Sequence, residues 1–210
     1  MFAGGGEGRQ ASRRGLLPAF ALGDLRFADA LVSTTTEEIE PTGRYQGILG
    51  LSVFKGYRVT LDLERSRMVM EPAAASPAGN PYWNVSGQLL VEAQARGDGA
   101  GLFMLDTGAA RSEVAFDLAR SVPGASLGPE IGVRGYSGSM AGTRALRGFA
   151  FAFGALSSEG RELIAADLTQ RSRLGGVELS GLLGLDLLDG TSVTFDTKSQ
   201  KIEVTRRAKR

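Results

Sequence analysis

Asp106 is the residue whose setting in this sequence most clearly indicates chemistry. It follows the apolar run Leu102–Leu105 and precedes Thr107 and Gly108. A short apolar run that ends on one acidic residue predicts a buried strand leading into a functional loop. The Thr107 hydroxyl suits a hydrogen bond to nearby backbone, and Gly108 permits a backbone conformation or a close approach that a side chain would block. Asp106 is therefore the candidate catalytic residue.

The elements around Asp106 are expected to be mainly strands. Gln88–Ala95 alternates in part between polar and apolar residues, Arg96–Gly99 has the composition of a turn, and Gly101–Leu105 is apolar again. This pattern predicts a β-hairpin whose second strand carries Asp106. Beyond the loop, Ser112–Arg120 combines a cap-like serine with apolar residues near helical spacing, which predicts a short helix or turn.

The composition excludes most catalytic machinery other than carboxylates. The 210 residues include no histidine and no cysteine, so the chain cannot form a Ser-His-Asp triad, a cysteine nucleophile, or a thiolate or imidazole metal site. A Ser-Lys arrangement remains open beside carboxylate chemistry. The formal net charge of +1 gives no indication of nucleic-acid binding, and no stretch approaches the ~20 apolar residues of a membrane span. We expect neither a metal ion nor a cofactor.

A second motif lies downstream at Gly181–Leu188, with the sequence Gly-Leu-Leu-Gly-Leu-Asp-Leu-Leu. Together with Asp-Thr-Gly-Ala at Asp106–Ala109, it resembles the aspartic peptidases, specifically their retropepsin-like bacterial branch. The resemblance covers roughly Leu89 to Val204. It implies an all-β fold, a closed acid-protease β-barrel lobe, in which Asp106 is a catalytic carboxylate. Relatives in this branch are often exported, so an exported or periplasmic full-length protein is the expectation from the resemblance.

The resemblance also implies residues that support the catalytic turn. They are Thr107, Gly108 and Ala109 within the turn, and Leu183, Gly184 and Asp186 as structural residues beneath it. Ala109 lacks the hydroxyl that many relatives have at this position, which predicts activity at milder acidity. Asp186 is expected to support the fold near the start of a short helix, because aspartate is favoured at helix N-caps.

The segment Ile131–Met140 is where the family has its substrate-covering flap. Gly135, Tyr136 and Ser137 lie within it, and Tyr136 is a candidate substrate contact. Glycines at both ends would let such a hairpin open and close. The alternative is a surface hairpin that takes no part in substrate binding.

An internal repeat organises the whole chain. Gly47–Asp62 aligns without a gap on Gly181–Asp196 at a constant offset of 134, since 184 − 50 and 196 − 62 give the same value. Upstream, Leu17–Leu25 resembles Leu146–Leu156 if the loops differ by a few residues. We therefore interpret residues 1–71 as the C-terminal half of a first acid-protease-like lobe.

The remaining segments follow from this division. Residues 72–83 form a linker rich in proline and small residues, 84–205 a complete acid-protease-like lobe, and 206–210 a basic tail. Tyr82 and Trp83 are expected to be buried aromatics at the junction between the lobes.

The repeat places the counterpart of Asp106 at 106 − 134 = −28, before Met1. We expect the chain to be the downstream part of a longer two-lobed protein, with a degenerate first lobe as the alternative. The second catalytic carboxylate would come from a missing upstream lobe or from a homodimer partner, because retropepsins build their site across a two-fold interface.

The resemblance therefore implies an endopeptidase that hydrolyses polypeptides with water activated by two carboxylates, of which this chain supplies Asp106. The alternative is a non-catalytic, peptidase-like module that binds peptides or mediates assembly, because a fold alone does not decide the function.

Overall fold

A computed structural model describes residues 12–35, 47–73, 78–97, 99–135 and 138–206 of the chain. This part is mostly β, which confirms the all-β expectation. Its helical segments are short: η1 (Leu51–Phe54), α1 (Phe116–Ser121), α2 (Thr169–Gly175) and α3 (Leu185–Leu188). No helix in the described ranges is long and apolar enough to span a membrane. The chain divides into two compact units, residues 1–53 with 132–141 and residues 54–131 with 142–210.

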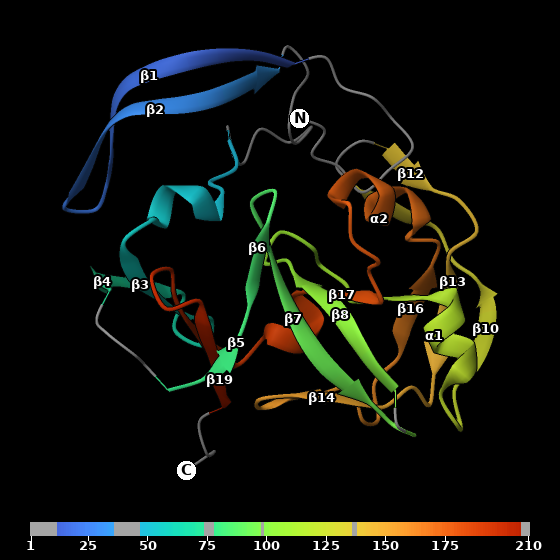
Figure 1. Cartoon of the computed structure of the whole chain (residues 1–210). Helices are drawn as coiled ribbons and strands as arrows, with labels where there is room; N and C mark the ends of the chain where they lie inside the picture. The colour runs from blue at the N-terminus through green and yellow to red at the C-terminus, as the bar shows by residue number, and fades with distance from the viewer. Residues whose placement is uncertain (1–11, 36–46, 74–77, 98, 136–137, 207–210) are drawn as a thin grey trace. The chain divides into compact units, whose positions relative to one another are not determined.

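The second unit contains a ten-stranded sheet that curls into a half-barrel (Figure 1). In order across the sheet, its strands are β10 (Ser126–Glu130), β13 (Arg144–Arg147), β16 (Leu163–Ala166), β9 (Glu113–Ala115), β17 (Gly181–Leu183), β8 (Gly99–Leu105), β7 (Gln88–Ala95), β14 (Phe151–Phe153) and β15 (Leu156–Ser157), with β6 (Trp83–Val85) paired to β7 off this path. Buried Leu, Phe and Ile side chains fill the curl.

The predicted hairpin that carries Asp106 is confirmed. Strands β7 and β8 pair antiparallel from Leu89 opposite Leu105 to Ala95 opposite Gly99. The helix predicted over Ser112–Arg120 is correct only in its second half, because Glu113–Ala115 forms strand β9. This strand pairs with β16 and β17, which come later in the chain, so local helical spacing could not reveal it.

The second sheet joins the two copies of the repeat. Its order is β4 (Arg67–Pro72), β3 (Tyr57–Asp62), β18 (Thr191–Asp196), β19 (Lys201–Arg206) and β5 (Asn80–Pro81). The bounds of β3 and β4 coincide with those of β18 and β19 at the offset of 134 found in the sequence. The repeat in the sequence is therefore a repeat in the structure.

A local two-fold relation connects these copies. Thr60 lies opposite Thr194 in the antiparallel pair of β3 and β18, and their hydroxyl oxygens are 2.9 Å apart. Each copy also donates one equivalent backbone bond to the other, from Leu63 N–H to Thr191 O and from Thr197 N–H to Tyr57 O. Because equivalent residues face each other, a pseudo-two-fold axis passes between the two threonines.

The first unit contains two hairpins. Strands β1 (Ser12–Leu22) and β2 (Leu25–Thr35) form a ribbon closed by Gly23, which has a φ of +57° that favours glycine. Phe20 and Phe27 stack across it with ring centroids 4.7 Å apart. Strands β11 (Val133–Gly135) and β12 (Gly138–Met140) pair within the predicted flap segment.

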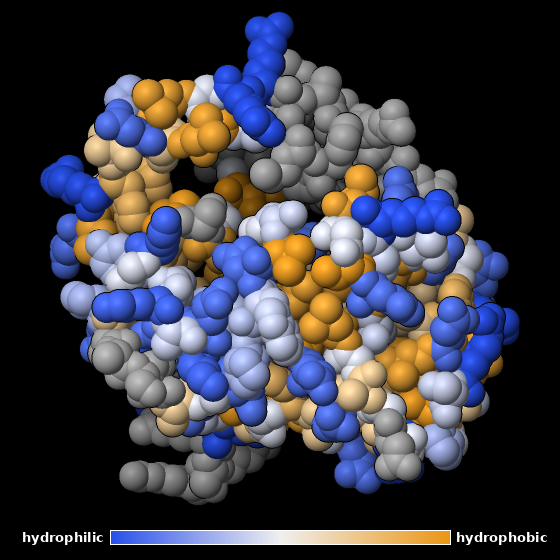
Figure 2. Space-filling view, in the orientation of Figure 1, coloured by the Kyte–Doolittle hydropathy of each residue, from blue (hydrophilic) through white to orange (hydrophobic). Residues whose placement is uncertain are grey.

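The two aromatic residues expected at the lobe junction differ in burial. Tyr82 is buried, and its hydroxyl donates to the carbonyl oxygen of Asp196. The expectation for Trp83 was wrong, since this residue of the short strand β6 is 43% exposed. Figure 2 shows other apolar side chains at the surface among many hydrophilic ones.

The turn between β18 and β19 depends on one buried carboxylate. Asp196 Oδ1 accepts hydrogen bonds from the N–H groups of Lys198 and Ser199 at 3.0 and 2.8 Å and from the Ser199 hydroxyl at 2.9 Å. Burial alone would raise the pKa of Asp196, but these bonds and the Arg58 charge hold the pKa below its ordinary value. A lowered folded-state pKa stabilises the protein above the unfolded-state pKa, and this stabilisation is lost as the pH falls through the folded-state value.

Replacing Asp196 should therefore be costly at neutral pH. We expect Asp196→Ala to lower the free energy of unfolding by about 1–3 kcal/mol at pH 7, and by less at about pH 2, in urea titrations. The matched control is Asp62→Ala in the equivalent turn, where, among the residues that the structure describes, the carboxylate accepts bonds only from Arg65. An equal loss in both variants at both pH values would contradict this account.

Candidate active site

The backbone holds Asp106 at the end of β8. Its N–H donates to the carbonyl oxygen of Leu183 at 3.0 Å, which extends the β8–β17 ladder by one residue. Its Oδ1 accepts the N–H of Gly108 at 2.9 Å, and its carbonyl oxygen accepts the N–H of Ala109 at 3.2 Å. The side chain is half-buried, while Thr107 and Gly108 are exposed. A carboxylate in this setting has a fixed direction and contact with water.

Gly184 lies beneath this turn, where the sequence predicted a packing residue. A Cβ atom there would come within 2.7 Å of the Arg111 carbonyl oxygen and 2.9 Å of the Ala109 carbonyl oxygen. Such contacts are too short for real Cβ atoms, so only glycine allows the two segments to approach this closely. The next residues fasten them, because Leu185 N–H donates to Ala109 O at 2.8 Å and Asp186 N–H donates to Ala110 O at 3.2 Å.

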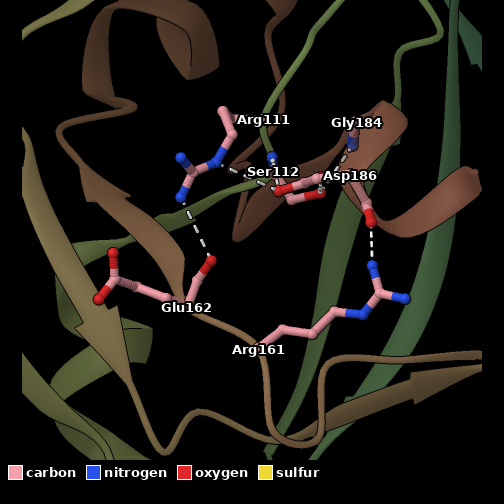
Figure 3. A network of polar contacts seen from close by, with 6 residues as sticks. All are labelled: Arg111, Ser112, Arg161, Glu162, Gly184 and Asp186. Carbon is pink, nitrogen blue, oxygen red and sulfur yellow. Dashed lines mark hydrogen bonds and ion pairs between the residues drawn. The ribbon is translucent and has the colours of Figure 1, made fainter.

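Asp186 supports the turn in a different way from the one predicted. It lies in the first turn of α3, whose N-cap position is Gly184 and has no side-chain cap bond. Its carboxylate instead accepts the Ser112 N–H at 3.0 Å and the Ser112 hydroxyl at 2.5 Å, and the same hydroxyl accepts the Gly184 N–H at 2.9 Å (Figure 3). Ser112 therefore connects both ends of the supporting segment to the loop that follows Asp106.

Two arginines extend this network. Arg111 Nε lies 3.6 Å from Asp186 Oδ2, and its Nη2 donates to the carbonyl oxygen of Glu162 at 3.3 Å. Arg161 Nη1 donates to the carbonyl oxygen of Asp186 (Figure 3). The sequence did not single out Arg111, Arg161 or the bonds of Ser112, because these contacts join residues 25 to 75 positions apart, the largest being 186 − 111 for Arg111 and Asp186.

The predicted flap residues are described only in part. Gly135 ends β11 and lies opposite Gly138 in the β11–β12 hairpin. Tyr136 and Ser137 lie outside the described residues, so the predicted substrate contact of Tyr136 stays a prediction.

Comparisons with known proteins leave the site to be judged by its geometry. No protein-family model and no curated protein matches this chain. Among the described residues, no group of three or more His, Cys, Asp or Glu side chains could hold a metal ion. The arrangement provides one oriented carboxylate, that of Asp106, in a turn that packs on Gly184 and is held by the bonds of Ser112 and Asp186.

The tight contact at Gly184 gives a direct test of this support. We expect Gly184→Ala to lower the free energy of unfolding by about 2 kcal/mol or more, because its Cβ meets backbone that cannot move aside. Gly175→Ala in α2 is the control, since its Cβ would meet only ordinary contacts at 3.7 Å. Thermal and urea unfolding of both variants provide the measurement, and similar stabilities would contradict the packing argument.

The Ser112 hydroxyl should also be important for stability. Ser112→Ala leaves the Gly184 N–H without its acceptor, so we expect a loss of about 1–3 kcal/mol in the free energy of unfolding. Ser121→Ala removes an exposed hydroxyl that donates to Leu118 O and should cost much less. If Ser112→Ala unfolds at the same urea concentration as wild type, the hydroxyl does not hold the segment.

Proposed function

We propose that this chain supplies a catalytic carboxylate of an aspartic endopeptidase, within a retropepsin-like acid-protease lobe. The observation that supports this most is the setting of Asp106, half-buried at a strand end with its Oδ1 on the Gly108 N–H at 2.9 Å. The support beneath the turn, through Gly184, Ser112 and Asp186, adds to it because a catalytic group needs a rigid second layer. The substrate would be a polypeptide.

The reaction needs a second carboxylate. One carboxylate takes a proton from a water molecule while the other, protonated, polarises the scissile carbonyl group. Two carboxyl groups that hold one water molecule between them share a proton, because ionising both of them is costly. In this proposal Asp106 is one of the pair, and no metal or covalent intermediate takes part.

The symmetry of the second sheet supports a two-lobed source for the other carboxylate. The axis between Thr60 and Thr194 relates β3 and β4 to β18 and β19. A second Asp-bearing turn related by such an axis would be the natural partner of Asp106. Under this axis it would belong to another lobe of the same polypeptide, whereas a second copy of this chain would have to supply it through a different two-fold axis.

Removing the Asp106 carboxylate tests the proposal. We expect Asp106→Asn in the complete protein, with both carboxylates present, to lower cleavage of a peptide library at about pH 4 to 6 by at least about 100-fold, with the fold preserved. Asp117→Asn, an exposed aspartate on α1, is the matched control and should cleave like wild type. Peptide binding without any Asp106-dependent cleavage would contradict the proposal and support a non-catalytic peptide-binding module.

Mixing experiments then identify the source of the second carboxylate. If two copies each supply Asp106, adding excess Asp106→Asn protein should lower the activity of wild type, because mixed dimers lack one carboxylate. If the second carboxylate belongs to the same polypeptide, activity should stay proportional to the wild-type protein present.

A further inference from the structure

Glu113 lies on the same face of the half-barrel sheet as Asp106. Residues directly opposite each other on neighbouring strands point to the same face, as do residues two apart on one strand. Leu182 lies opposite both Met104 on β8 and Glu113 on β9. Asp106 follows Met104 by two residues and continues the ladder through its bond to Leu183. The register therefore directs both carboxylates to one face.

The Glu113 carboxylate is buried and, among the described residues, has one cationic partner. Glu113 is 5% exposed, and its Oε2 lies 3.2 Å from Nη1 of Arg171 on α2. Within the described ranges neither of these two atoms makes a hydrogen bond, so charge rather than hydrogen-bond geometry joins them. Its strand partners on either side, Ile164 of β16 and Leu182 of β17, are apolar.

The charges that act on Glu113 come from both α2 and the Asp106 turn. Burial raises the pKa of Glu113 above its ordinary value, the Arg171 charge opposes this by lowering the pKa, and the Asp106 charge raises the pKa further. The two charges that act on Glu113 therefore come from different segments, one from α2 and one from the turn that carries Asp106.

We propose that Glu113, paired with Arg171, is a positioning residue of the candidate active site that sets the charge environment of Asp106. A role for Glu113 in catalysis rests on the proposed function. A negative charge on Glu113 favours the protonated form of a neighbouring acid, and a carboxylate pair that shares a proton needs such an environment. Arg171 limits the effect by neutralising part of that charge. Removing Glu113 and removing Arg171 should therefore change the charge at the site in opposite directions.

A titration of Glu113 tests the coupling without any need for activity. Carboxyl carbon signals of ¹³C-labelled protein are followed against pH by NMR, with the Glu113 signal assigned by its disappearance in Glu113→Gln. We expect Asp106→Asn to lower the pKa of Glu113 and Arg171→Met to raise it. Arg171→Lys, which keeps the charge, should restore the wild-type midpoint. Arg147→Met, which removes a surface pair to Glu162 at 2.7 Å, is the control and should change nothing.

The outcomes separate this inference from the proposed function. If the midpoint of Glu113 stays in place in folded Asp106→Asn and Arg171→Met, the inference is overturned, whatever the peptidase assay shows. If the midpoint moves as expected while no Asp106-dependent cleavage exists, the coupled pair stands and the peptidase proposal fails. Where cleavage exists, Glu113→Gln should move the acidic limb of the pH–rate profile to lower pH, and an unmoved limb would contradict a role for Glu113 in the reaction.

Discussion

The structure around Asp106 depends on how closely β17 approaches its neighbours. Strand β17 pairs in parallel with β8 and antiparallel with β9, and the glycines at Gly181 and Gly184 make room for this. A Cβ at Gly181 would lie 2.3 Å from the Phe103 ring, and one at Gly184 would meet the backbone of the turn. Because interiors are close-packed, these two positions fix the distance between the strand that carries Asp106 and the segment that supports it.

The support is polar as well as steric. Ser112 and Asp186 satisfy each other's hydrogen-bonding groups beside Gly184, and Arg111 and Arg161 connect them to the chain near β16. A polar network of this kind, with Ser112 buried and Asp186 partly buried, holds one geometry when its members are satisfied. The face of the sheet toward which Asp106 points also carries Glu113, whose partner Arg171 comes from a helix with no buried residues. The electrostatic setting of the turn is thus built from several separate segments.

Much of the fold could be predicted from local sequence, and most of the site's surroundings could not. The β7–β8 hairpin followed from apolar patterning, and the repeat offset of 134 matches strand bounds on both sides of the Thr60–Thr194 pair. Strand β9 was missed because its partners lie later in the chain, and Trp83 proved exposed on the short strand β6. The Glu113–Arg171 pair joins residues 58 positions apart, as 171 − 113 gives, and no periodicity marks it.

The most direct test of the central claim is the affinity of a peptide analogue that carries a secondary hydroxyl in place of the scissile carbonyl. Such a group imitates the tetrahedral intermediate and is held by the catalytic carboxylates, so it should bind far more tightly than the parent peptide. Calorimetric titration should give an affinity that falls at least about tenfold in Asp106→Asn, a loss of about 1.4 kcal/mol. Equal binding of the analogue to wild type and Asp106→Asn would contradict the assignment of Asp106 as a catalytic carboxylate.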